Sequence, residues 1–265
     1  MRIHRIILSI VTLLIAGTIA YVSFMYVYVD HMFAPITLLE KPHLAPTYRE
    51  WVFPVVPFIH KVNTPMRAQQ KDAKYPGFEV DVLSYEGNLL AAHDSVEAQL
   101  NIKLEDIFKS VKDAQKKMWW LDIKNELTNE KIDAIVQQAA QYNIPAEHLF
   151  FEVSAGPTAK RITQKNLGLL LPLPDGFDKD TNTPSVRVQL NTNLLELWKE
   201  YKPLAISASF GKYAYLRAYF PNMPKVIYYS ATKRPSIKKA FMRKHMEQDP
   251  SVKIFMTDEY SWINL

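Results

Sequence analysis

The sequence contains no cysteine in its 265 residues. This absence excludes disulfide bonds, thiolate nucleophiles and zinc sites built from thiolates, and it is compatible with an oxidising compartment. Glycine is also scarce, at seven residues. Neither sign of charge forms a block, because 32 Lys and Arg and 27 Asp and Glu are spread along the chain, for a net charge of +5. Nucleic-acid-binding surfaces gather basic residues into a patch, so no nucleic-acid partner is expected.

Long apolar runs are confined to the N-terminus. Residues 6–29 are uncharged and overwhelmingly apolar, and as a helix they would span about 36 Å, enough to cross a bilayer with some tilt. Arg2, His4 and Arg5 precede this run and Asp30 follows it. The positive-inside rule therefore places the N-terminus in the cytoplasm and the rest of the chain on the extracytoplasmic (periplasmic) side of the inner or plasma membrane.

A cleaved signal peptide is the competing interpretation of this segment. Its small-residue site would be Thr18-Ile19-Ala20, but the apolar run continues well beyond it, and signal-peptide cores are shorter. We therefore predict an uncleaved transmembrane signal-anchor at residues 1–30. Residues 31–54 carry four prolines and no persistent period, which predicts a linker that holds a single domain, residues 55–265, away from the membrane.

Residues 55–265 alternate between short β-rich runs and helix-compatible stretches, which predicts a parallel α/β fold. The expected strands are residues 55–60, 78–83, 118–123, 148–153, 167–171, 204–207, 225–229 and 253–256. The clearest expected helices are residues 104–116, 129–142 and 236–248, with N-caps expected at Thr64, Thr128 and Ser236. Eight strands favour a closed (β/α)8 TIM-type barrel over an open sheet, although residues 89–92 and 185–190 are compatible with further strands. Residues 172–184 are expected to form a long loop.

Polar side chains gather where the expected strands end, and barrel enzymes place their chemistry at that end. Glu79 and Asp81 lie on one face of the second strand, and two adjacent carboxylates repel each other unless a cation or a proton lies between them. The other polar groups expected at this rim are His60, Lys61, Asn63, His93, Asp94, Asp122, Lys124, Glu152, Ser154, Ser207 or Ser209, Thr257 and Asp258.

Each of these groups also has a purely structural interpretation. A histidine at a strand end is often a structural residue, the carboxylates of the second strand could face solvent, and Asp122 with Lys124 could form an ordinary salt bridge. Trp119 and Trp120 suit packing better than ligand binding. The gathering of six such groups at one end of consecutive strands favours a functional site.

Five short motifs resemble those of the glycerophosphodiester phosphodiesterase family, within the phospholipase-C-like phosphodiesterase barrels. In order along the chain they are His60-Lys61-Val62-Asn63, Glu79-Val80-Asp81-Val82, Ala92-His93-Asp94, Leu121-Asp122-Ile123-Lys124 and Met256-Thr257-Asp258. The likeness runs from about residue 55 to residue 263. The first and fourth motifs are similar to the menorin-type branch of that superfamily.

The resemblance implies a metal-dependent phosphodiesterase on a (β/α)8 barrel. It implies that His60 and His93 serve as acid and base, that Glu79, Asp81 and Asp122 hold a divalent ion, and that Lys124 contacts the phosphate. Lys61, Asn63 and Glu152 are further candidates for substrate contact. Independently, imidazole can move protons near neutral pH, and carboxylate ligands suit Mg2+ or Ca2+ rather than zinc.

Three positions depart from the glycerophosphodiesterase motifs. Lys61 stands in place of Arg, Val62 in place of Gly, and Asp122 in place of Glu. Lysine keeps the charge of arginine but cannot grip phosphate with two parallel hydrogen bonds. These changes bear on which phosphodiester is bound more than on phosphodiester chemistry itself.

The sequence therefore predicts a membrane-anchored phosphodiesterase that acts on glycerophosphodiesters or phospholipid head groups. The attacking oxygen could be water or a neighbouring hydroxyl of the substrate. The alternative from another class is a catalytically silent barrel that serves as a membrane-tethered binding or assembly module. A polysaccharide-active barrel with Glu152 and Asp122 as its carboxylate pair is a third possibility, but it leaves the two histidines without a role.

Overall fold

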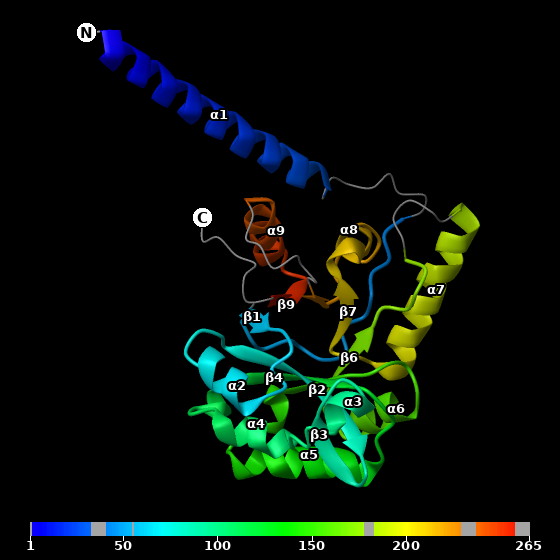
Figure 1. Cartoon of the computed structure of the whole chain (residues 1–265). Helices are drawn as coiled ribbons and strands as arrows, with labels where there is room; N and C mark the ends of the chain where they lie inside the picture. The colour runs from blue at the N-terminus through cyan, green and yellow to red at the C-terminus, as the bar shows by residue number, and fades with distance from the viewer. Residues whose placement is uncertain (1, 33–40, 55, 178–182, 229–236, 258–265) are drawn as a thin grey trace.

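A computed structural model describes residues 2–32, 41–54, 56–177, 183–228 and 237–257 (Figure 1). Its strands are β1 Val56–Ile59, β2 Gly77–Tyr85, β3 Asn88–Ala91, β4 Met118–Ile123, β5 Leu149–Glu152, β6 Gly168–Pro172, β7 Ala205–Ser209, β8 Lys225–Tyr228 and β9 Val252–Thr257. Its α-helices are α1 Arg2–Met32, α2 Pro65–Lys71, α3 Ser95–Ala98, α4 Leu104–Ser110, α5 Asn129–Gln141, α6 Pro157–Gln164, α7 Pro184–Tyr201, α8 Phe210–Tyr219 and α9 Ile237–Gln248. Two short 3-10 helices, Ala114–Lys116 and Ala146–His148, precede β4 and β5.

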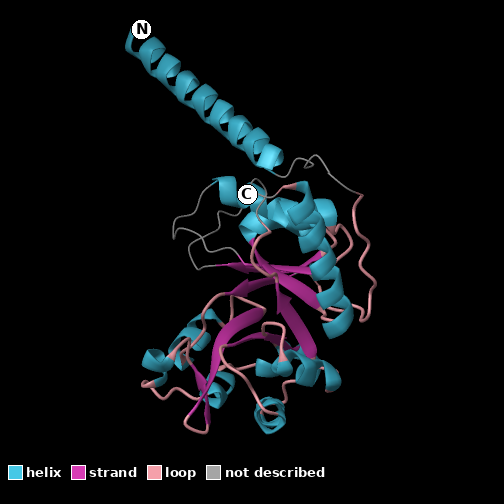
Figure 2. Ribbon diagram, turned by 90° about the vertical axis from the view of Figure 1, so that its right-hand side faces the viewer, coloured by secondary structure: helices cyan, strands magenta, loops and turns pink. Residues whose placement is uncertain are grey.

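Eight of the strands form a closed parallel barrel, with helices around its outside (Figure 2). The order runs β1, β9, β8, β7, β6, β5, β4, β2, and β1 pairs with both β9 and β2, which closes the ring. The ninth strand, β3, pairs antiparallel with β2 as a hairpin outside the ring. The predicted TIM barrel is confirmed.

The strand pattern separates an inner core from an outer core. On β4, Trp120 contributes to the cluster inside the barrel, while Trp119 and Leu121 pack outward against helices. On β2, Phe78, Val80 and Val82 belong to the outer cluster. Because side chains alternate along a strand, Glu79 and Asp81 face the inside, as expected.

Several element assignments need correction or refinement. The expected helix over residues 104–116 is divided, because Val111 adopts an extended backbone after α4 and only a 3-10 turn follows. Residues 185–190 lie in α7 rather than in a strand, whereas residues 89–92 do supply a strand, β3. Thr64 and Thr128 cap α2 and α5 as predicted. Ser236, Tyr229 and Asp258 lie outside the described residues.

The N-terminal helix α1 contains an apolar span, Ile7–Val29, long enough to cross a membrane. The same length and composition would also fit a signal sequence. Its C-terminal part packs on α9, with the rings of Tyr26 and Phe241 5.2 Å apart, edge to face. Val29 is fully buried there, in the outer core cluster.

Residues 41–54, here called the strap, have no helix or strand and run along the barrel wall. Hydrogen bonds tie the strap to the body: His43 N donates to Tyr219 O at 2.7 Å, and Asn222 Nδ2 donates to Ala45 O at 2.8 Å. Near its end, the Trp51 ring stacks on Phe150 at 5.1 Å, at the N-terminal end of the barrel core. The strap therefore packs against the domain and covers the end of the barrel opposite to the strand C-termini.

Candidate active site

The carboxylates of β2 and β4 meet because of the sheet register. Asp81 on β2 pairs in register with Asp122 on β4, and Asp122 pairs with Glu152 on β5. Glu79 lies one inward-facing position earlier on β2. Asp122 and Glu152 lie at the C-terminal ends of β4 and β5, and Asp81 lies near the end of the part of β2 that pairs with β4. This is the end where barrel enzymes carry their sites.

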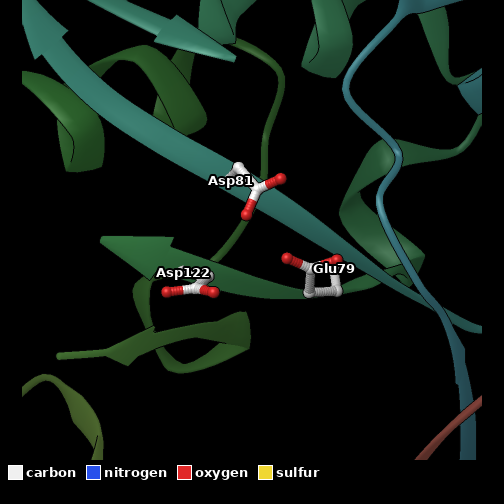
Figure 3. A group of neighbouring side chains, drawn as sticks. All are labelled: Glu79, Asp81 and Asp122. Atoms are coloured by element: carbon white, nitrogen blue, oxygen red, sulfur yellow. The ribbon is translucent and has the colours of Figure 1, made fainter. Parts of the chain in front are cut away.

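Glu79, Asp81 and Asp122 face a common space between strands (Figure 3). Each offers one oxygen, and these oxygens lie within 4.8 Å of one another. Glu79 and Asp81 are buried. Burial, followed by the nearby charge of Asp81, holds the pKa of Glu79 well above its ordinary value.

Lys124 supplies the positive charge within this cluster. Its Nζ lies 2.6 Å from Asp81 Oδ1 and 2.5 Å from Asp122 Oδ2. Burial acts to lower the pKa of Lys124, but the charge of Asp122 and the hydrogen bonds to both carboxylates outweigh it and raise the pKa. Three carboxylates and one ammonium leave a formal charge of −2, and oxygen ligands suit Mg2+ or Ca2+. The residues present therefore fit a hard divalent cation.

Asp81 has more hydrogen-bond and ion-pair partners than the other carboxylates of the cluster. Besides Lys124, it accepts a hydrogen bond from Asn63 Nδ2 at 2.7 Å and lies 3.3 Å from His93 Nδ1. Burial acts to raise the pKa of Asp81, but these contacts together bring it below its ordinary value. Asp81 is therefore held as a carboxylate in a fixed orientation.

The two histidines contact different carboxylates of the acidic cluster. His60 Nε2 lies 3.8 Å from Glu79 Oε2, and His93 reaches Asp81 through Nδ1. Both side chains are about half exposed, at 43% and 55%. Each imidazole thus contacts a buried carboxylate on one side and solvent on the other.

Lys61 adopts a left-handed backbone conformation, with φ of 57°. This turn aims its backbone N–H at Glu79 Oε2, at 2.5 Å, and its side chain reaches Glu97 Oε1 at 2.7 Å. The following residue, Val62, is fully buried. Lys61 therefore adopts the strained backbone conformation, and the Val62 side chain packs in the hydrophobic core.

Glu152 is buried at the edge of the cluster and held from two sides. Trp120 Nε1 donates to Glu152 Oε2 at 2.6 Å, and Ser207 Oγ donates to the other oxygen. Burial and the neighbouring Asp122 raise the pKa of Glu152 to about 7, although both hydrogen bonds act in the opposite direction. Glu152 therefore changes charge near neutral pH.

One cavity of about 320 Å³, here called the acidic cavity, collects most of the predicted residues. Its wall includes His60, Lys61, Glu79, Asp81, His93 and Asp122. Lys124 and Glu152 also line it. Asn63 does not line this cavity, because its amide is turned toward Asp81. Asp94 instead caps α3, accepting from Val96 N and Glu97 N at 2.9 Å each.

Sequence reasoning missed two residues of this region. Tyr228, at the end of β8, lines the acidic cavity, and burial followed by the charges of Glu152 and Asp122 raises its pKa. Glu97 joins two site segments, because it pairs with Lys61 and accepts from His93 N at 2.9 Å. The position of Tyr228 at a strand end was an available signal, whereas nothing local to Glu97 indicates its partners.

No protein-family model matches the sequence, and no curated protein matches it. Among solved structures, a glycerophosphodiester phosphodiesterase from Parabacteroides distasonis is similar, with 13% identity over 83% of this chain and 94% of that chain and a TM-score of 0.49. An orotidine 5'-phosphate decarboxylase from Thermotoga maritima has 10% identity over 78% and 91%, with a TM-score of 0.44. A dipeptide epimerase from Enterococcus faecalis, complexed with Mg and a dipeptide, has 14% identity, with a TM-score of 0.45. This last match covers 76% of this chain but about half, 54%, of the epimerase.

These matches are enzymes of different reaction classes. Similarity at this level does not distinguish one activity from another. The function of this chain must therefore be argued from the acidic cavity.

Proposed function

We propose that the chain is a membrane-anchored, metal-dependent phosphodiesterase that acts on glycerophosphodiesters or phospholipid head groups. One observation carries this proposal: a carboxylate triad of Glu79, Asp81 and Asp122 shares a single cavity with two histidines and two lysines. The triad would hold Mg2+ or Ca2+. When bound, such an ion would offset negative charge on the phosphoryl oxygens.

The two imidazoles supply the proton transfers. Cleaving a phosphodiester requires a base for the attacking oxygen and an acid for the departing alkoxide. A hydrogen donated from His93 Nδ1 to Asp81 would leave Nε2 as an acceptor, which is the form that a general base requires. His60, beside Glu79, would then protonate the leaving group. Water or a neighbouring substrate hydroxyl would serve equally as the attacking group.

The membrane placement belongs to the same proposal. The apolar span of α1 would anchor the chain, with the barrel on the extracytoplasmic side. A barrel held beside a bilayer would meet lipid-derived phosphodiesters readily. Its substrates would therefore come from lipid turnover.

The test is hydrolysis by the full chain reconstituted in nanodiscs. With Mg2+ or Ca2+ present, we expect alcohol release from at least one member of a panel of glycerophosphodiesters and lysophospholipids. His60→Ala and His93→Ala should each lower kcat by about 10²- to 10⁴-fold. His43→Ala, on the strap, is the matched control and should retain activity. If the wild-type chain cleaves no member of the panel, the proposal is wrong.

A second candidate, a binding module without catalysis, is favoured by the position of Lys124. Its ammonium already bridges Asp81 and Asp122, so these two carboxylates have a partner without any ion. Under this alternative the histidine variants would bind partners normally, and divalent ions would not stabilise the fold.

A further inference from the structure

A second cavity, of about 350 Å³, lies beside the acidic cavity and shares two of its residues, His60 and Lys61. We call it the side pocket. Its apolar wall consists of Ala91, at the end of β3, with Leu100 and Ile102 from the segment between α3 and α4. The two cavities therefore meet at His60, one of the proposed proton-transfer residues.

Several polar groups of the side pocket have protein partners. Asn63 is bonded to Asp81, and Thr64 Oγ1 accepts from Arg67 N at 3.2 Å. Glu97 pairs with Lys61 and also accepts from His93 N. Arg67 Nη2 donates to His60 O at 3.0 Å. Because these atoms are bonded to protein, the side chains that carry them present hydrocarbon as well as polar surface to the pocket.

Leu100 is the large apolar side chain of this wall that stands in solvent, because it is 68% exposed. Val96 and Met66, each next to a lining residue in the sequence, are also exposed, at 71% and 67%. An exposed apolar side chain in the wall of a pocket is typical of a ligand-binding surface. An apolar ligand that entered the pocket would remove this hydrocarbon from water.

We propose that the side pocket binds the apolar chain of an amphiphilic phosphodiester while the phosphate of the same molecule lies in the acidic cavity. This inference rests on the proposed phosphodiesterase function and narrows its substrate class to diesters that carry a hydrocarbon chain. Leu100 is then a specificity-determining residue. It selects among phosphodiesters without taking part in the proton transfers.

The position of the pocket indicates how such a ligand arrives. The elements that carry it, α2 and α3, lie at the end of the barrel away from α1 (Figure 1). An anchor at α1 would thus hold its bilayer on the far side of the domain from the side pocket. The ligand is therefore a dispersed amphiphile rather than a lipid still embedded in the anchoring bilayer.

The first test compares two choline diesters that differ only in the chain, both supplied to the full chain in nanodiscs. Glycerophosphocholine has no chain, and 1-octanoyl-lysophosphatidylcholine, used as a monomer, has one. Burial of hydrocarbon contributes up to about fourfold in kcat/KM per methylene, so we expect the octanoyl substrate to be preferred by at least about tenfold. Leu100→Asn should remove most of this preference and lower kcat/KM for glycerophosphocholine far less, because that substrate has no chain to bury against Leu100. Leu44→Asn, on an equally exposed leucine of the strap, should behave as wild type.

A binding measurement separates failure of the pocket from failure of the proposed function. Octylphosphonate and ethylphosphonate carry the anion but have no ester to cleave, and empty nanodiscs give the background for partition into lipid. We expect the octyl ligand to bind about tenfold more tightly to the wild-type chain and to lose that advantage in Leu100→Asn. If the wild-type chain shows this advantage for the octyl ligand, and Leu100→Asn loses it, while no diester is cleaved, the proposed function is wrong and the pocket assignment is supported. If diesters are cleaved but neither experiment shows a chain preference, or if Leu100→Asn does not reduce it, the pocket assignment is overturned.

Discussion

Asn63 and Asp81 are joined by two hydrogen bonds that run in opposite directions. Asn63 Nδ2 donates to Asp81 Oδ2 at 2.7 Å, and Asp81 N donates to Asn63 Oδ1 at 3.0 Å. Both residues are buried. The loop after β1 is thus fixed to β2 at the carboxylate that also contacts Lys124 and His93.

Replacing this asparagine should weaken both the fold and the site. Asn63→Leu leaves the buried Asp81 N–H without its acceptor, which should lower the free energy of unfolding by about 1–3 kcal/mol. The pKa of Asp81 should rise as one donor is lost. Asn125→Leu is the matched control, because Asn125 also makes two hydrogen bonds with one residue, to the backbone N and O of Ser84, at an exposed place. Denaturant titration of the two variants would contradict this prediction if their losses were equal.

Glu152 should make the stability of the ion-free protein depend on pH. Its pKa is near 4.5 when unfolded and about 7 in the fold, so the folded state holds the proton more tightly. The resulting stabilisation is fully present below pH 4.5 and is lost as the pH rises through 7. The total loss in the free energy of unfolding is at most about 3 kcal/mol. Glu152→Gln should remove this decline between pH 5 and 8, measured by denaturation in chelator, whereas the exposed Glu147→Gln should keep it. An unchanged decline in Glu152→Gln would disprove the assignment.

Divalent ions should stabilise the fold if the carboxylate triad holds them. At an ion concentration 100 times the dissociation constant, binding adds about 2.7 kcal/mol to the free energy of unfolding, which a melting curve with Mg2+ or Ca2+ would detect. Asp122→Asn should remove most of that gain. A melting temperature that does not respond to either ion would favour the binding-module alternative.

Lys124→Met should destabilise the ion-free protein and should increase the stabilisation that a divalent ion adds. Without ion, Asp81 and Asp122 lose their ammonium partner, and the protein should be destabilised by about 3–5 kcal/mol. Adding ion should raise the free energy of unfolding of the variant more than that of the wild type, because the variant has one more uncompensated negative charge at the site. Equal gains in both proteins would show that Lys124 and the ion do not act on the same carboxylates.

Trp51 should contribute to stability although it belongs to a segment without regular structure. Its ring stacks on Phe150 and meets Phe53 edge to face at the N-terminal end of the barrel. Trp51→Ala should cost about 3 kcal/mol, measured by denaturant titration. Val52→Ala is the matched control, because Val52 is 71% exposed and should change stability little. A loss shared by both variants would point to backbone disturbance of the strap instead.

The barrel could be predicted from the sequence because the patterns that mark its strands and helices are local. The strand over 118–123 has the predicted bounds, since a short, nearly continuous apolar run defines it without reference to any partner. Residues 185–190 were ambiguous because Val186 and Val188 have high strand propensity, whereas the structure continues the helix from Pro184 through them. Propensity is a weak guide where tertiary packing decides.

The site was only partly accessible to the same reasoning. The carboxylates of β2 and β4 could be placed on one rim because strand ends meet in a barrel. The pairing of Asp81 with Asn63, or of Glu97 with Lys61, depends on how loops fold back over the barrel. Loop geometry is set by contacts distant in sequence, and no local pattern contains it.

The strap has a mechanical consequence if α1 is the anchor that we propose. Tension transmitted along α1 would load its packing on α9, and then the bonds of His43 to Tyr219 and of Ala45 to Asn222, before it reached β1. These bonds lie at and just after the end of α8. The strap would thus act as a strain relief, so that lateral drag on the anchor is taken up before it reaches β1.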